Sequence, residues 1–160
     1  MTKTNAARIL DRLGINYELL EYEVDESDLS AIAVANKLNQ NIDQVFKTLV
    51  LQGDKSSVFV CIIPGAEELD LKKVAHLSGN KSVSMIPMKE ILNLTGYIRG
   101  GCSPIGMKKS YPTYIDESCM LYDYILVSAG IRGVQMKIAP IDLIRTISSQ
   151  MGDLILIKNH

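Results

Sequence analysis

The sequence has no tryptophan and only two phenylalanines, two histidines and three cysteines among its 160 residues. The cysteines, Cys61, Cys102 and Cys119, are odd in number and widely separated, and no C-x-x-C pair accompanies the two histidines, so neither a disulfide framework nor a common zinc site is expected. No apolar run approaches the ~18 residues that a membrane-spanning helix needs, and the first residues lack the apolar middle of a signal peptide. We therefore expect a soluble cytoplasmic protein with reduced thiols, without membrane contact, metal ion or cofactor.

A strong charge of either sign is also missing. Seventeen basic and eighteen acidic side chains give a net charge of −1. Because affinity for nucleic acid comes largely from neutralised phosphates, we expect no DNA binding and only local or partner-assisted contact with RNA. The candidate basic patch comprises Lys108 and Lys109 with Arg99, Arg132 and Lys137, and the alternative is that these are ordinary solvated surface charges.

The length and the apolar content of 47% are enough for one domain, expected over residues 1–160. Apolar periodicity and turn residues predict helices over residues 5–13, 30–38, 71–77 and 140–148, with another beginning at Pro87. Thr4, Ser30 and Asp70 are the expected caps of the first three. Strands are predicted over residues 17–22, 46–52, 57–63, 83–86, 113–115, 124–128, 134–138 and 154–157. This order predicts an α+β domain with a mixed, largely antiparallel sheet, curled and barrel-like, flanked by helices.

Lys47 lies in the strongest strand pattern of the chain, which begins a predicted hairpin with residues 57–63. Alternation places Lys47 on the same face as Leu49 and Leu51. A buried ammonium is costly without an anionic or carbonyl partner, so a lysine beside an apolar face often serves a ligand. The alternative is that Lys47 lies at the sheet rim and extends into water.

A glycine-rich loop occupies residues 100–106, Gly-Gly-Cys-Ser-Pro-Ile-Gly. Its three glycines allow the backbone to approach a ligand closely and to point N–H groups at a developing oxyanion. The same residues also suit an ordinary turn, and the spacing matches no phosphate-binding loop.

A protein nucleophile is poorly supported. Cys102 lies within the glycine-rich loop, but only His76 and His160 could act as its base. Cys61 has the pattern of a core residue, and Ser103 lacks the G-x-S-x-G context of a serine hydrolase.

Four segments stand together in this sequence: Phe46-Lys47-Thr48-Leu49, Gly96-Tyr97, Gly100-Gly101-x-Ser103-Pro104-x-Gly106 and Ile138-Ala139-Pro140-x-Asp142-Leu143. In order and spacing they resemble the motifs of the YbaK/EbsC family, whose members are Cys-tRNA(Pro) deacylases. The likeness extends from the first predicted helix almost to the end of the chain.

The resemblance implies a domain related to the editing insertion of bacterial prolyl-tRNA synthetases that hydrolyses mischarged Cys-tRNA(Pro) in trans. In this family the substrate's own thiol is proposed to attack its ester, with Lys47 as the essential lysine and Gly101 and its neighbours polarising the carbonyl. Tyr22 and Asp142 match residues that would shape the pocket and hold the α-amino group. The implied substrate-binding set is completed by Phe46, Thr48, Gly100, Ser103, Pro104 and Gly106.

Three other interpretations remain open at this stage. The chain could be an Ala-tRNA(Pro) deacylase, since such relatives share the fold. It could hold aminoacyl-tRNA or the synthetase without catalysis, or Cys102 could be a protein nucleophile. The expected partners are tRNA(Pro), with tRNA(Cys) as a second candidate, and prolyl-tRNA synthetase in a transient complex that would compensate for the near-neutral charge.

Overall fold

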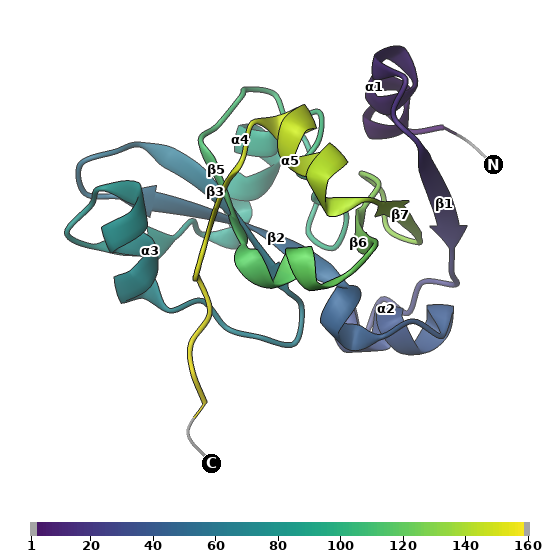
Figure 1. Cartoon of the computed structure of the whole chain (residues 1–160), viewed down its shortest axis with the longest axis horizontal. Coiled ribbons are helices and arrows are strands. Elements are labelled where there is room, and N and C mark those ends of the chain that lie inside the picture. Colours follow the sequence, from purple (N-terminus) through teal and green to yellow (C-terminus); the bar gives the residue numbers. More distant parts are fainter. Residues whose placement is uncertain (1–2, 159–160) are drawn as a thin grey trace.

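The computed structural model describes residues 3–158, in which helices and strands alternate along the chain (Figure 1). The α-helices are α1 (Asn5–Leu13), α2 (Ala31–Leu38), α3 (Leu71–Ser78), α4 (Ile91–Thr95) and α5 (Pro140–Ile147). Short 3₁₀ turns are η1 (Ile42–Gln44), η2 (Met88–Glu90) and η3 (Glu117–Leu121). The strands are β1 (Tyr17–Glu21), β2 (Phe46–Gly53), β3 (Val58–Pro64), β4 (Val83–Met85), β5 (Thr113–Asp116), β6 (Ile125–Ser128), β7 (Val134–Ile138) and β8 (Gln150–Gly152).

The predicted helix caps are confirmed. The side chains of Thr4, Ser30 and Asp70 accept hydrogen bonds from backbone N–H groups in the first turns of α1, α2 and α3. Gly14 and Gly79 end α1 and α3 in the left-handed conformation, which glycine adopts without a Cβ clash. None of the described helices combines the length and the apolar character needed to cross a membrane.

The strands form two sheets rather than one. The smaller is antiparallel in the order β1-β7-β6, and the larger is mixed in the order β4-β2-β3-β5-β8, with β3/β5 and β5/β8 parallel. Between the sheets the described residues form a single bridge, Val45 to Leu126. The α+β prediction with a mixed sheet is therefore confirmed, whereas no closed barrel is found in the described part of the chain.

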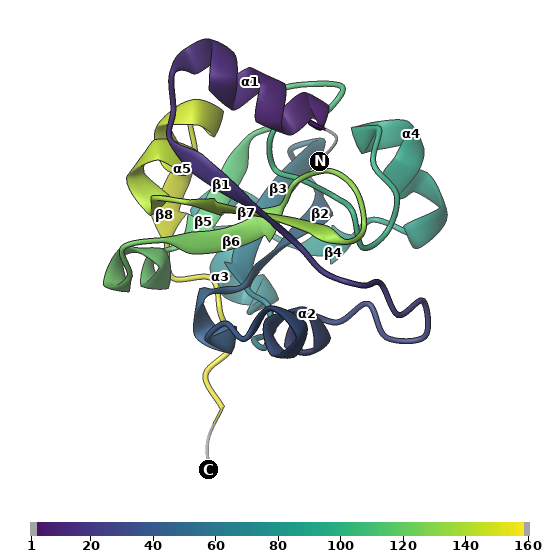
Figure 2. The ribbon, with the colours of Figure 1, turned by 90° about the vertical axis from the view of Figure 1, so that its right-hand side faces the viewer.

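Three apolar clusters join these layers. The largest lies between the two sheets and beneath α1 and α5, and includes Phe46, Ile62, Met136 and Leu143. A second packs the opposite face of β2 and β3 against α3, and a third packs α2 against β6. In Figure 2, α1 lies above the strands and α2 below them, with α4 on the right and α5 on the left.

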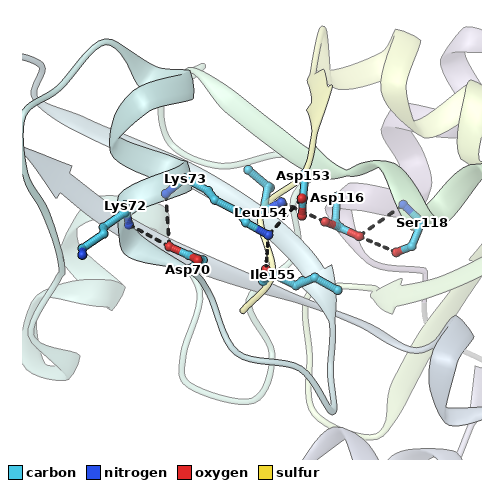
Figure 3. Close-up of polar contacts among 8 residues, drawn as sticks. All are labelled: Asp70, Lys72, Lys73, Asp116, Ser118, Asp153, Leu154 and Ile155. Atoms are coloured by element: carbon cyan, nitrogen blue, oxygen red, sulfur yellow. Dashed lines mark hydrogen bonds and ion pairs between the residues drawn. The ribbon is translucent and has the colours of Figure 1, made fainter. Parts of the chain in front are cut away.

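The predicted last strand, residues 154–157, is wrong. The strand is β8, Gln150–Gly152, which pairs with β5, and the following segment forms only the bridge between Leu69 and Ile155. The unbroken apolar run Leu154 to Ile157 resembled a strand, but only Leu154 is fully buried in the core, whereas Leu156 and Ile157 are exposed. Figure 3 shows how this segment is held: the buried Asp116 carboxylate accepts a hydrogen bond from the Leu154 N–H at 3.0 Å.

Candidate active site

A cavity of about 520 Å³ lies where the two sheets meet α2 and the segment before α4. This volume is within the range of small-ligand sites. Its walls come from β2, from the N-terminal end of α2, from η2 and the start of α4, from the glycine-rich loop, and from the adjoining ends of β6 and β7. Lys47, Phe46, Thr48, Gly100 and Cys102 all line it, so the structure brings together the predicted lysine strand and part of the predicted loop.

The cavity opens along an uncovered edge of β2. On one side β2 pairs with β3 over its whole length, whereas on the other it pairs with β4 only from Leu51 onward. The Val50 carbonyl accepts a hydrogen bond from Ile86 N–H at 3.0 Å on this second side. Because alternate residues of a strand present their backbone groups to the same edge, the backbone groups of Thr48 also point there. The strand edge can therefore contact a ligand with both backbone and side-chain groups.

Lys47 is half-buried and lies on the predicted face of β2. The apolar residues of that face, Leu49 and Leu51, pack in the second cluster, against α3. Within the described residues the Lys47 Nζ forms no ion pair within 4 Å and donates no hydrogen bond. Burial lowers the pKa of the ammonium below its usual range, and the carboxylates of Glu68 and Glu67 partly oppose this. The side chain is thus a partly desolvated cation that is available to a ligand.

The glycine-rich loop is held tightly against the β6–β7 turn. A Cβ on Gly101 would lie 3.2 Å from the backbone of Ile131 and Arg132, which explains the glycine at this position. The Gly101 N–H donates to the Ile98 carbonyl at 3.0 Å. Because this N–H is already paired, the expected polarisation of the substrate carbonyl by Gly101 and its neighbours would have to come from other donors of the loop, and it stays a prediction. Gly100 and Cys102, on either side, line the cavity.

Three other predicted loop residues lie beneath the cavity wall and do not line the cavity. Ser103 is fully buried, and its Oγ accepts a hydrogen bond from Ile105 N–H at 3.2 Å. Pro104 is also buried, and Gly106 adopts a φ of 79° against the Tyr97 hydroxyl. None of the three is among the cavity-lining residues, so we expect them to shape the loop, and their contact with substrate stays a prediction.

Tyr22 and Asp142 are likewise not brought to the cavity. Tyr22 packs in the α2 cluster, and its N–H donates to the Gly133 carbonyl at 2.9 Å. Asp142 lies in the first turn of α5, where a carboxylate is favourable to the helix dipole. A shared site for these two side chains around the α-amino group is therefore not supported by their positions.

The cavity offers cations but no base. Lys47 and Arg99 are its charged lining residues, and no aspartate, glutamate or histidine is among the described residues that line it. Burial raises the pKa of the Cys102 thiol to about 11, so at neutral pH this thiol is protonated and a weak nucleophile. His76 lies on α3, away from this cavity, and His160 is outside the described residues.

Two polar residues of the cavity were missed at the level of sequence. Ser128, at the end of β6, accepts a hydrogen bond from Gly130 N–H, and Gln135 lies opposite it on β7. No signal in the sequence singled out Gln135, because in Val-Gln-Met-Lys-Ile (residues 134–138) it shares a strand face with Lys137, as an ordinary surface residue would. Whether that side chain pointed to solvent or to a cavity depended on how the two sheets meet.

Comparison with known proteins places this architecture in a family. A sequence profile described as the aminoacyl-tRNA editing domain matches residues 26–146. A proposed Cys-tRNA(Pro)/Cys-tRNA(Cys) deacylase, EbsC of Enterococcus faecalis, is 46% identical over 152 residues, covering 95% of this chain and 93% of its own. A proline–tRNA ligase of Thermosipho africanus is 33% identical over 76 residues, covering 48% of this chain and 13% of the ligase.

A solved structure described as a proposed trans-editing enzyme for prolyl-tRNA synthetase superimposes with a TM-score of 0.83 at 25% identity. The match covers 98% of this chain and all of the other. The shared fold, the matched profile and the 46% identical relative agree with one another. The chain belongs to the YbaK/EbsC family of aminoacyl-tRNA editing domains.

Proposed function

We propose that this chain hydrolyses the ester of Cys-tRNA(Pro), with the cysteinyl thiol of the substrate as the nucleophile. The observation that carries the proposal is the composition of the cavity: two cations and several uncharged polar groups, without a carboxylate or histidine among its described lining residues. A site of this kind can bind the phosphate-bearing end of a tRNA and stabilise negative charge, but it has no general base to activate water. A nucleophile supplied by the substrate removes the need for such a base.

In the proposed reaction the cysteinyl sulfur attacks its own ester carbonyl. A carbon–sulfur bond forms, the bond from the carbonyl carbon to the terminal ribose oxygen breaks, and the thiol proton passes to that oxygen. The products are free tRNA and a cyclic thiolactone, which water then opens to cysteine. Such an intramolecular attack depends mainly on holding the reactive conformer and stabilising the oxyanion, so a rigid cavity with fixed donors is sufficient.

The cavity supplies each of these needs. Lys47 and Arg99 are both among the cavity-lining residues and would bind the terminal phosphate and orient the ester. The hydroxyls of Thr48 and Ser128 line the cavity and can donate to the developing oxyanion. Phe46 and Gly100 would limit the room around the aminoacyl group.

The function is tested by incubating purified protein with Cys-tRNA(Pro) and, separately, with Ala-tRNA(Pro), each labelled in the amino acid. We expect catalytic release of cysteine and little release of alanine, because alanine has no thiol. Release of alanine alone would reassign the substrate. Protection of both esters without turnover would support a binding module instead of a deacylase.

We further propose that prolyl-tRNA synthetase presents the tRNA in a transient complex. The net charge of −1 gives the chain little general affinity for tRNA, and its cavity can hold only the terminal part of one. Selection of tRNA(Pro) over tRNA(Cys) should therefore sharpen when the synthetase is added to a competition assay with both cysteinyl-tRNAs. Full selectivity without the synthetase would contradict this.

A further inference from the structure

Charge is unevenly distributed along the chain on the two sides of the cavity mouth. Residues 91–115 contain no aspartate or glutamate, and their cations form what we call the basic rim: Arg99, Lys108 and Lys109. Residues 18–28, in contrast, carry six carboxylates and no lysine or arginine. The net charge of −1 is therefore a sum that contains two segments of opposite sign.

Both segments border the cavity. Ile91 and Arg99 of the first segment line it, and the acidic segment leads directly into Leu29, which also lines it. In Figure 2, α4 and the loop between β1 and α2 lie on the same side of the molecule, with α4 above the loop. A polyanion that enters the cavity therefore meets an attractive surface on one side of the mouth and a repulsive surface on the other.

The charges of the basic rim are available to a ligand. Its three side chains are exposed, and none forms an ion pair within 4 Å in the described part of the chain. The other two cations of the predicted basic patch are compensated. Arg132 pairs with Glu26 of the acidic segment at 2.6 Å, and the Lys137 Nζ lies 3.9 Å from a Glu18 oxygen. The structure thus divides the predicted patch and leaves the rim as its uncompensated part.

The backbone of the rim is anchored beside the cavity. The Lys108 N–H donates to the Thr95 carbonyl at 3.1 Å, and the Arg99 carbonyl accepts a hydrogen bond from Arg132 Nε at 2.8 Å. The Lys108 side chain lies over Gly96, where a Cβ would come within 3.3 Å of its Cγ. Because these contacts fix where the cations begin, a ligand that binds them has only the side-chain ends to order.

We propose that the acceptor stem of the tRNA leaves the cavity over the basic rim, with backbone phosphates on Lys108 and Lys109, and away from residues 18–28. This inference rests on the proposed function, since it assumes that the aminoacyl end occupies the cavity. Arg99 connects the two parts of the site, because it belongs to the rim and also lines the cavity. Lysine contacts of this kind position an RNA backbone without reading its sequence. The rim therefore supplies the local RNA contact of a chain that has almost no net charge.

The test measures binding of an uncharged hairpin, the acceptor stem of tRNA(Pro) with its single-stranded 3′ end, by fluorescence anisotropy over a series of salt concentrations. The double variant Lys108→Gln/Lys109→Gln should bind about 10-fold more weakly at low salt, and its slope of log K against log salt should be smaller by about 2. The matched control Lys55→Gln/Lys72→Gln removes the same charge from two exposed lysines outside the rim and should change neither value. Thermal unfolding of each variant shows that it is folded.

Equal losses in the two double variants, an unchanged salt slope in the rim variant, or no binding by the wild type at low salt would overturn the inference. If the double rim variant does not fold, the single variants Lys108→Gln and Lys109→Gln decide the matter, each with a slope smaller by about 1. Hydrolysis of Cys-tRNA(Pro) is measured in parallel, and the loss in the rim variant should appear in KM. Loss of hairpin binding in that variant, without cysteine release by the wild type, would contradict the proposed reaction and leave the RNA surface standing.

Discussion

Replacement of Lys47 by methionine is expected to lower kcat/KM for Cys-tRNA(Pro) by about 100-fold or more. Methionine preserves the length and the apolar packing of the side chain but removes its charge. Loss of one preorganised electrostatic contact in an active site commonly costs about 10²–10³ in rate. The measurement is the single-turnover release of labelled cysteine. Lys55→Met provides a matched control, because Lys55 is exposed in the turn after the same strand, and its rate should not change.

The same variant should not be less stable than the wild type. Burial lowers the pKa of the Lys47 ammonium, so at neutral pH the charged side chain reduces the stability of the folded state. This loss of stability is relieved only as the pH rises from the lowered pKa towards the ordinary lysine pKa. Removal of the charge relieves the penalty at once. Activity of the wild type should correspondingly fall at alkaline pH below the usual titration range of lysine. Equal activity of Lys47→Met and the wild type would remove Lys47 from the proposed site.

Replacement of Asp116 by alanine is expected to reduce the free energy of unfolding by about 3 kcal/mol. The Asp116 carboxylate is 2% exposed and accepts hydrogen bonds from Leu154 N–H at 3.0 Å, Ser118 N–H at 3.2 Å and Ser118 Oγ at 2.5 Å (Figure 3). Its loss leaves the buried Leu154 N–H without an acceptor. The segment that follows β8 would then separate from the core, which urea denaturation can measure.

Asp153→Ala is the control for this effect. Asp153 is the neighbour of Leu154 and forms an ion pair with Lys73 at 2.9 Å, but its side chain is half exposed. Exposed pairs contribute only about 0–1 kcal/mol, so this variant should lose little stability. Equal losses in the two variants would mean that Asp116 does not hold the segment as described.

The local elements were predictable because their signals are local. Thr4, Ser30 and Asp70 cap helices through hydrogen bonds within one turn. The β-branched and aromatic residues of 46–52 and 57–63 form a hairpin that is packed on both faces. The segment of residues 154–157 misled the same reasoning, because four consecutive apolar residues resemble a buried strand, yet only Leu154 is fully buried and Leu156 and Ile157 are exposed.

The site was predicted only in part for a related reason. Lys47 and Gly100 were found because a strand lysine and a glycine-rich loop are unusual in themselves, and the resemblance to a family joined them. Gln135 became visible only when the two sheets were placed against each other, since its position in the cavity wall depends on how they meet. Asp142 was selected by motif, yet its position in the first turn of α5 is away from the cavity lining.

The central claim, that the substrate supplies the attacking sulfur, is tested most directly with seryl-tRNA(Pro). Serine differs from cysteine by one atom and fits the same space, but its hydroxyl is a far weaker nucleophile without a base. We predict that this protein cleaves cysteinyl-tRNA(Pro) catalytically and seryl-tRNA(Pro) at least about 100-fold more slowly, a difference of roughly 3 kcal/mol in activation free energy. Comparable rates for the two esters would contradict the account.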